Sequence, residues 1–320
     1  MAIVGGEEQL IGHVRAAFAR HDVLGNALVD DAAALPPVQA GAVRVVTTDV
    51  AVEGVDFRRG LYPLSFAGCR AIAQNLSDLA ASGAVPTGFV WSLTIPQSWS
   101  LVDVMGFVEG AALTAGTFHC PLLGGDLSST PGAFSCAVTA FGDVQGAPHL
   151  RTGARPGDAI YVSGALGASA AGLRLLQSHG QNLQTSAAFG NWLKSLDGES
   201  RRAVETHLEP TPQLELGTAL VQVATAAMDV SDGLLLDLNR LTRASGVAAD
   251  LDALESALDP VATQTEALMG GEDFALLWTA PAGVPMAAEG ARRIGWIVAG
   301  EGIVHRGQRL SAHGFDHFAD

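Results

Sequence analysis

The sequence contains little lysine, and its charge is dominated by one sign. Lys194 is the only lysine among 320 residues, so nearly all of the 18 basic residues are arginines. They are outnumbered by 33 acidic residues, which gives a formal net charge of −15. A nucleic-acid-binding protein generally needs a basic surface to neutralise phosphates, so we expect no nucleic-acid partner.

Motifs of several common catalytic folds are also missing. There is no GxxxxGK[ST] loop, and Lys194 lies in a polar stretch, which excludes a Walker-type site and the strand lysine of a protein kinase. Neither a GxSxG nucleophile elbow nor an HExxH zinc motif occurs. His207, in the segment HLEPTP, is interpreted as a structural histidine in a turn that could line a cleft.

Cysteines and long apolar runs are scarce as well. Cys69, Cys120 and Cys136 form no CxxC pair, which argues against a disulfide framework or a structural zinc site. No run of about 18 apolar residues is present, so no membrane span is expected. We therefore expect a soluble cytoplasmic protein with no membrane partner.

The remaining pattern is typical of a mixed α/β protein. With 48% hydrophobic and 16% charged residues the chain can bury a sizeable core, and its length suggests two domains. Strands are expected at 43–48, 88–95, 133–141, 159–163, 226–230, 274–279 and 294–298, and helices at 65–82, 101–117, 168–178, 213–225 and 232–245. The stretch 181–200 is expected to be irregular and exposed. A segment rich in Gly, Pro and Arg at 142–157 is the expected boundary, which divides the chain into 1–145 and 146–320.

Acidic residues recur in short segments of glycine and small residues, at the ends of predicted strands or the starts of helices. Each segment alone has a structural interpretation as a helix cap, a strand end or a turn. Their number, on both halves of the chain, favours a shared site. The segments are 29–31 (VDD), 47–49 (TTD), 75–78 (NLSD), 124–126 (GGD), 228–233 (MDVSDG) and 270–273 (GGED).

Asp78 is the most informative of these acids. The helix predicted around it has a buried stripe that includes Leu76 and Leu79. Asp78 shares a neighbouring face with Asn75, and no lysine or arginine lies within several residues of it. If it is buried, its carboxylate needs another partner, such as a divalent cation. A solvated Asp78 is the alternative.

Such carboxylates suit metal-assisted phosphoryl transfer. Mg²⁺ prefers oxygen ligands and usually binds one or two carboxylates together with substrate phosphates. Clustered carboxylates repel a phosphorylated ligand unless cations lie between them. In the GGD segment, backbone N–H groups could approach phosphate oxygens while Asp126 held the metal. Arg151 is the best-placed cation for a nucleotide phosphate, although a solvated linker position fits the sequence equally well.

Taken in order, these segments resemble the thiamine-monophosphate kinase family, which belongs to a superfamily of ATP-binding enzymes that includes aminoimidazole ribonucleotide synthetase and selenophosphate synthetase. The resemblance covers nearly the whole chain, through TTDVAVEGVDF, NLSDLAASGA, LLGGDLS, RTGARPGD, HLEPTP, MDVSDGL, MGGEDFAL and the terminal GFDHF. It implies a two-domain α/β (α+β) fold of the aminoimidazole ribonucleotide synthetase type, with mixed sheets flanked by helices and an active site in the interdomain cleft. It also implies direct in-line transfer of a phosphoryl group from ATP to thiamine monophosphate, the final step of thiamine diphosphate biosynthesis, with several Mg²⁺ ions and a homodimer built by pairing the N-terminal sheets.

The resemblance assigns roles to individual residues. The N-terminal domain, 1–145, would bind ATP and metal ions and form the dimer, and 146–320 would complete the active site. The expected metal ligands are Asp31, Thr48, Asp49, Asp78, Asp126, Asp229 and Asp232. The expected ATP contacts are Gly125, Asp126, Arg151 and Ser231, and catalysis is assigned to Asp126, Asp78 and Arg151. The expected substrate contacts are Asp56, Glu272 and Phe315, since acids and an aromatic ring suit the cationic thiazolium.

Three positions depart from the family pattern. Val29 stands where the family often has Gly, Asp56 where it often has His, and Gln213 where it often has Arg. These differences concern substrate contact more than the predicted metal ligands. Two alternatives stay open: another enzyme of the superfamily, such as aminoimidazole ribonucleotide synthetase, or a non-catalytic nucleotide-binding relative, which Asp56 and Gln213 favour.

Overall fold

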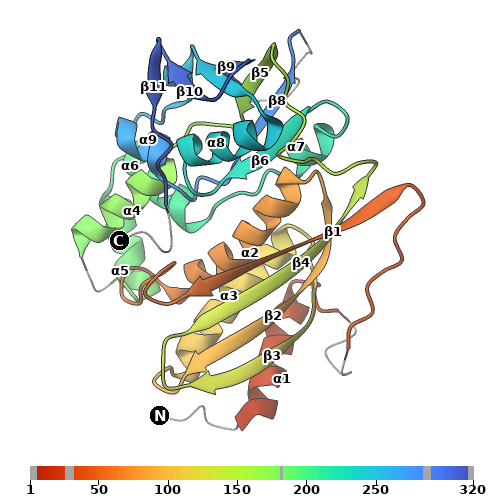
Figure 1. Cartoon of the computed structure of the whole chain (residues 1–320). Helices are drawn as coiled ribbons and strands as arrows, with labels where there is room; N and C mark the ends of the chain where they lie inside the picture. Colours follow the sequence, from red (N-terminus) through yellow and green to blue (C-terminus); the bar gives the residue numbers. More distant parts are fainter. Residues whose placement is uncertain (1–5, 26–31, 181–182, 284–289, 316–320) are drawn as a thin grey trace.

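Two β-sheets organise the chain, one in each half (Figure 1). The computed structural model describes residues 6–25, 32–180, 183–283 and 290–315. The first half contains α1 (Gly6–Arg20), β1 (Ala42–Val52), α2 (Leu64–Ala81), β2 (Val85–Pro96), α3 (Leu101–Thr117), β3 (Leu122–Thr130) and β4 (Ser135–Gln145). The second half contains β5 (Asp158–Val162), α4 (Ala168–His179), α5 (Ser186–Ser195), α6 (Gly198–Leu208), α7 (Leu214–Ala219), β6 (Ala226–Val230), α8 (Leu234–Ser245), β7 (Ala248–Leu251), η1 (Leu254–Ala257), α9 (Gln264–Met269), β8 (Ala275–Pro281), β9 (Arg292–Val298), β10 (Gly302–His305) and β11 (Gln308–Leu310).

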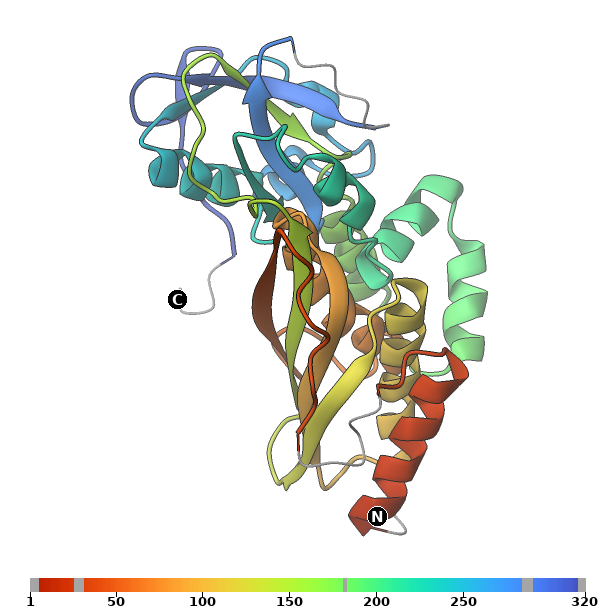
Figure 2. The ribbon, with the colours of Figure 1, turned by 90° about the vertical axis from the view of Figure 1, so that its right-hand side faces the viewer.

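The N-terminal sheet has one covered and one open face. Its strand order is β1-β4-β2-β3, with β4 antiparallel to both neighbours and β2 parallel to β3. Helices α1, α2 and α3 lie on the same side of it, as Figure 2 shows. Successive side chains alternate along β1, so Asp49 and Ala51 face the helices. Val46 and Val50 point the other way and are 62% and 51% exposed.

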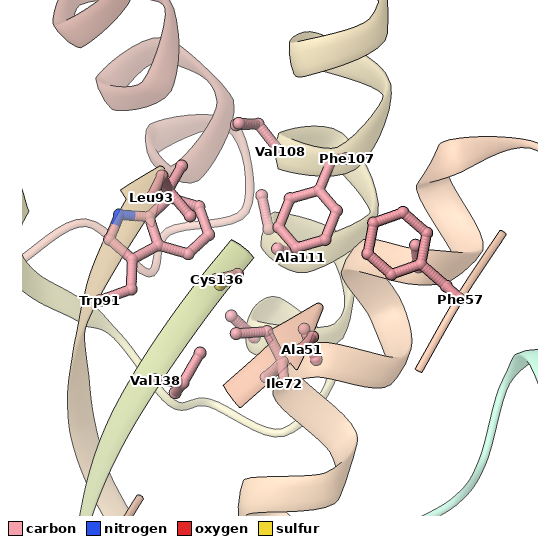
Figure 3. Packing of buried hydrophobic residues seen from close by; sticks show 14 of the residues in the cluster. Ala51, Phe57, Ile72, Trp91, Leu93, Phe107, Val108, Ala111, Cys136 and Val138 are labelled. Carbon is pink, nitrogen blue, oxygen red and sulfur yellow. The ribbon is translucent and has the colours of Figure 1, made fainter. Parts of the chain in front are cut away.

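Aromatic side chains fill the space between this sheet and its helices. Trp91, Phe107 and Phe57 pack there with Ile72 of α2 and Val138 of β4 (Figure 3). All five are at least 96% buried. Burying large aromatic side chains is a major contribution to the stability of such a core.

The helix α2 lies between the two sheets. It contacts β1 and β4 on one side, and β6, β8 and α7 on the other. The predicted helix 65–82 is confirmed, with its end at Gly83, whose φ of 77° and N–H bond to Ala80 O (2.9 Å) form a left-handed cap. The prediction of a single buried stripe along this helix was too narrow. With a sheet on each side, the helix is buried around most of its circumference.

The C-terminal sheet is larger and mixed. Its strand order is β11-β10-β7-β9-β5-β8-β6. Helix α8 packs against β6, β7 and β10, whereas α2 packs against β6 and β8, so the sheet is covered on both sides. This arrangement brings the ends of β1, α2 and β6 together where the two halves meet.

The structure differs from the sequence-based interpretation at three places. The stretch 181–200 contains α5 and the start of α6, whose N-caps are Thr185 and Asp197. The helix expected at 213–225 ends at Ala219, and Gln222 beyond it has a φ of 70°. The GGD segment lies inside strand β3 and is not a turn. Among the described residues, no helix is long and apolar enough to cross a membrane.

Candidate functional site

A cavity of about 640 Å³ lies where the two halves meet. Its walls come from β1, the segment after it, α2 and α4, and from the segments that follow β6 and α9. Most of the residues expected to form the site line this cavity, although their positions in the sequence are far apart. These residues are Asp49, Asp56, Asp78, Asp229, Ser231, Asp232, Glu272 and Phe315.

Asp49 and Asp78 face each other across the boundary between β1 and α2. Thr47 Oγ1 donates a hydrogen bond to Asp78 Oδ2. Burial, together with the negative charges of Asp78 and other cavity acids, raises the pKa of Asp49 to about 6. Burial also raises the pKa of Asp78, which the Thr47 hydroxyl and the positive charge of Arg151 oppose. The pair therefore concentrates negative charge at one end of the cavity.

Asp229 adds a third carboxylate, from the other half of the chain. It is the next-to-last residue of β6 and is 3% exposed. Ser77 Oγ of α2 donates a 2.6 Å hydrogen bond to Asp229 Oδ2. Burial and the charge of Asp78 raise the pKa of Asp229 to about 7. The Ser77 bond thus joins the two halves directly behind the cavity wall.

Ser231 and Asp232 form the turn between β6 and α8. The helix begins at Leu234, two residues later than predicted. Asp237, in the first turn of α8, accepts hydrogen bonds from Ser231 N (3.0 Å) and Asp232 N (2.9 Å) through Oδ2. Arg240 Nη1 bridges Asp237 Oδ1 (2.7 Å) and Asp232 Oδ2 (2.5 Å). The turn is therefore held by side chains of the helix that follows it.

Glu272 is held by a buried arginine from the other half. Arg70 of α2 is 4% exposed and donates to Glu272 Oε1 and to His207 O. His207 is buried in the last turn of α6, and its Nδ1 lies 3.0 Å from Ser169 Oγ. Burial lowers the pKa of His207 well below 6.5, and the charge of Arg70 lowers it further. His207 is therefore neutral, and it is itself one of the residues that line the cavity.

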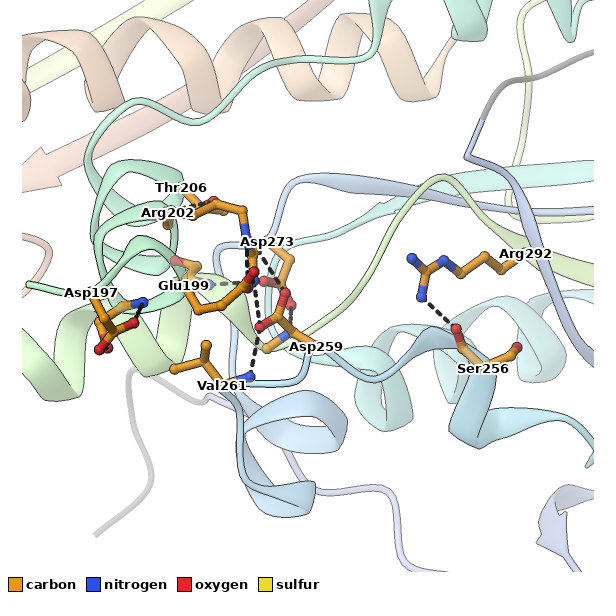
Figure 4. A network of polar contacts seen from close by, with 12 residues as sticks. Asp197, Glu199, Arg202, Thr206, Ser256, Asp259, Val261, Asp273 and Arg292 are labelled. Carbon is orange, nitrogen blue, oxygen red and sulfur yellow. Dashed lines mark hydrogen bonds and ion pairs between the residues drawn. The ribbon is translucent and has the colours of Figure 1, made fainter.

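The loop that carries Glu272 is also fixed by its neighbour Asp273. Asp273 accepts hydrogen bonds from Gly167 N (2.7 Å) and Ser169 N (3.2 Å) at the start of α4, and burial raises its pKa to about 7. Close by, Arg202 Nη2 donates to Asp259 Oδ1 (3.0 Å), as Figure 4 shows. Asp273 thus ties the loop that carries Glu272 to the start of α4, while the Arg202–Asp259 contact ties the segment before α9 to α6.

Three of the expected residues lie on the N-terminal sheet and do not line the cavity. Asp126 lies on β3, at the opposite edge of the sheet from β1, and two intervening strands separate these edges by about 14 Å. Thr48 lies on the open face of the sheet and donates to Val138 O (2.9 Å). A Cβ at Gly125 would stand 2.5 Å from Trp91 Cδ1, so close packing is sufficient to require glycine there. Their assigned roles remain predictions.

Arg151 is exposed in the segment between β4 and β5 and does not line the cavity, but its charge reaches Asp78. Asp31 lies outside the described residues. Within the described ranges, no three His, Cys, Asp or Glu side chains are arranged so that they could hold a metal ion by themselves. Any cation here would need ligands from a substrate, as Mg²⁺ commonly does.

Several supporting residues were missed at the level of sequence. Arg70 and Ser77 stand seven residues apart on α2, a spacing that places both on one face of a helix. That spacing was the available signal. For Asp237 the sequence signal was weaker: it is an acidic residue in the first turn of a helix, where its carboxylate can accept hydrogen bonds from free backbone N–H groups.

Comparison with known proteins places this geometry in a family. The model of the AIR synthase related protein N-terminal domain matches residues 29–144, and that of the C-terminal domain matches 155–307. The thiamine-monophosphate kinase of Salmonella typhimurium is 33% identical over 318 residues, which cover 91% of each chain. That of Bacillus subtilis is 34% identical over 262 residues, which cover 78% of this chain and 76% of the relative.

Solved structures agree with this assignment. The thiamine-monophosphate kinase of Stenotrophomonas maltophilia K279a aligns with a TM-score of 0.79 and 35% identity, over 97% of this chain and 99% of that one. AaThiL complexed with AMPPCP and TMP aligns with a TM-score of 0.76 and 29% identity, over 98% and 97%. Hydrogenase maturation protein HypE, at 18% identity and a TM-score of 0.73, shares the fold alone. By its sequence and fold, this chain belongs to the thiamine-monophosphate kinase family.

Proposed function

We propose that this protein transfers the γ-phosphoryl group of ATP to the phosphate of thiamine monophosphate, which yields thiamine diphosphate and ADP. The observation that carries the proposal is the acidic cavity, which is lined by carboxylates from both halves of a chain that is 33% identical to a thiamine-monophosphate kinase. A structural relative holds AMPPCP and TMP together, at a TM-score of 0.76. Six carboxylates with few basic neighbours do not attract phosphates unaided, so the substrates must arrive with cations.

The donor set fits Mg²⁺, and we propose that the reaction depends on it. Burial and mutual repulsion raise the pKa values of Asp49 and Asp229 to about 6 and about 7, a cost that a bound divalent cation would relieve. Asp49 and Asp78, with Asp229 and Asp232, would hold the ions together with substrate phosphates. Bound Mg²⁺ would neutralise charge on the two phosphorylated substrates.

The protein's own residues position the reactants. The acceptor phosphate is ionised at neutral pH, so no general base is needed for its attack on the γ-phosphorus. We assign Glu272 and Phe315 to the thiamine moiety, because a carboxylate and an aromatic ring both attract a cationic heterocycle. Asp56 is also assigned to this side, although one of its oxygens already accepts Val52 N at 2.7 Å. Arg151, close enough to influence Asp78, is assigned to the ATP phosphates.

We further propose that the protein is a cytoplasmic homodimer. The open face of the N-terminal sheet carries exposed Val46 and Val50 on β1, an apolar surface suited to a second copy. Thr48 and Asp126 belong to the same face. The three cysteines are buried and unpaired, which suits a reducing compartment.

A direct assay tests the proposed function. The purified protein is incubated with ATP, Mg²⁺ and thiamine monophosphate, and thiamine diphosphate is quantified after chromatography. We expect stoichiometric formation of thiamine diphosphate and ADP, and none in the presence of EDTA. ADP formation without thiamine diphosphate, or full activity in EDTA, would contradict the proposed reaction or its metal dependence respectively.

A further inference from the structure

The backbone of residues 231 and 232, which we call the junction, connects segments that form the walls of the cavity. All four of its backbone polar groups are used in contacts outside the turn. Ser231 O accepts Glu272 N at 2.7 Å, and Asp232 O accepts Phe315 N at 3.0 Å. The two N–H groups, of Ser231 and Asp232, both donate to Asp237. One short segment thus connects the loop after α9, the segment after β11 and helix α8.

Two glycines allow the neighbouring backbones to approach this junction closely. A Cβ at Gly271 would stand 2.4 Å from Ser231 O, and one at Gly314 would stand 2.3 Å from Asp232 O. These distances are too short for any side chain, so the three backbones touch directly. Glu272 itself has a φ of 65°, an uncommon conformation that its hydrogen bond to Ser231 O supports. A shift of the junction is therefore transmitted to Glu272 and Phe315.

Burying the Asp237 carboxylate is energetically unfavourable if the side chain serves only to fill space. Its side chain is fully buried, with 0% exposure. Burying a carboxylate is costly unless strong donors surround it, and an apolar side chain of similar volume is often equally stable. Here the donors are the two junction N–H groups and Arg240 Nη1 at 2.7 Å. The arrangement specifies geometry, because only an acceptor with two lone-pair-bearing oxygens satisfies all three.

We propose that Asp237 is a positioning residue that fixes the Ser231–Asp232 backbone and, through its two carbonyls, the Glu272 and Phe315 walls of the cavity. The substrate side of this inference rests on the proposed function, whereas the structural side does not. Asp237 does not line the cavity and need not touch either substrate. Its effect is expected on thiamine monophosphate, because both residues held by the junction carbonyls are assigned to the thiamine moiety, and also on ATP, because Ser231 and Asp232 themselves are assigned to ATP and to its metal ions.

The test compares Asp237→Asn with Asp250→Asn. Asp250 is exposed on β7, so the control makes the same chemical change on the surface of the same half. Both proteins are assayed well below their unfolding temperatures. For Asp237→Asn we expect the KM for thiamine monophosphate to rise on the order of tenfold, together with a rise in the KM for ATP, because small displacements of positioning groups are costly. Asp250→Asn should match the wild type.

Amide hydrogen exchange provides a readout that needs no activity. The Glu272 and Phe315 amides donate to the junction carbonyls, so we expect both to exchange faster in Asp237→Asn and to be unchanged in Asp250→Asn. A folded Asp237→Asn protein with exchange and KM values like those of the control overturns the proposal. If the wild type makes no thiamine diphosphate, the proposed function fails and exchange alone decides the role of Asp237.

A second variant covers the case in which Asp237→Asn does not fold. Gly314→Ala leaves Asp237 in place but forces the Phe315 segment away from Asp232 O. We expect the same rise in KM for thiamine monophosphate and faster exchange of the Phe315 amide. A Gly314→Ala protein with wild-type values for both would show that the junction does not set the cavity wall.

Discussion

Replacing Arg70 by methionine tests how the two halves share the cavity wall. The substitution keeps a long apolar side chain and removes a guanidinium that donates to His207 O and Glu272 Oε1. Hydrogen bonds that involve a charged group contribute about 1.5–3 kcal/mol each. The bond to His207 O is buried and keeps that value, whereas the Glu272 side chain is 34% exposed, so water compensates for part of its loss. We therefore expect the free energy of unfolding to fall by about 3 kcal/mol.

The measurement is urea unfolding followed by tryptophan fluorescence, with Arg20→Met as the control. Arg20 forms a surface ion pair with Glu109, and its side chain is 54% exposed, so its loss should cost about 0–1 kcal/mol. The KM for thiamine monophosphate should also rise in Arg70→Met, since Glu272 loses its partner. Equal destabilisation by the two substitutions would refute the reasoning that burial makes the Arg70 contacts strong.

Three further predictions concern the acids, pH and helix packing. Asp78→Asn and Asp126→Asn should each lower kcat by about a hundredfold or more at saturating Mg²⁺ while leaving the circular dichroism spectrum intact; near wild-type rates in both would remove their assigned roles. His207 stays neutral in the folded protein, whereas in the unfolded chain it binds a proton below about pH 6.5. The free energy of unfolding should therefore fall as the pH drops, by at most about 1.4 kcal/mol per pH unit. In His207→Gln that part of the decline, measured by urea unfolding between about pH 7.5 and about pH 5.5, should disappear, and an unchanged slope would contradict it. A Cβ at Gly68 would stand 1.9 Å from a carbonyl oxygen of α3, so Gly68→Ala should lower the free energy of unfolding by about 3 kcal/mol or more. In the control Gly106→Ala, the nearest atom to the new Cβ lies at 3.5 Å, so this variant should keep its stability. Comparable urea midpoints for the two variants would show that α2 and α3 separate easily.

The convergence of acids was predictable because each stood in a recognisable segment. Asp49, Asp78, Asp229 and Asp232 were expected to share a site, and they line one cavity. The segments ended predicted strands or lay on a predicted helix, and in a layered fold such ends meet at one edge. Family resemblance supplied the order of the segments, which periodicity alone could not.

The burial of α2 was not predictable from its periodicity. A helical stripe identifies one packed face, but Arg70 and Ser77 are buried by elements of the other half of the chain, which the local sequence does not describe. The position of Asp126 shows a related limit. Two glycines before an acid predict a phosphate-binding turn, yet Gly125 is accommodated against Trp91 within a strand. A glycine pattern indicates that another group approaches the backbone closely, but it does not show whether that group is a ligand or a side chain of the protein.

The place of α2 restricts how substrates can reach the cavity. Ala80 of this helix packs with Leu276 and Trp278 of the C-terminal sheet, and all three are at least 99% buried. Swinging the halves apart like a book would strip this contact and expose its apolar surface to water. Substrates are therefore expected to enter without a wide separation of the two halves, and the helix keeps both walls of the cavity at a fixed spacing.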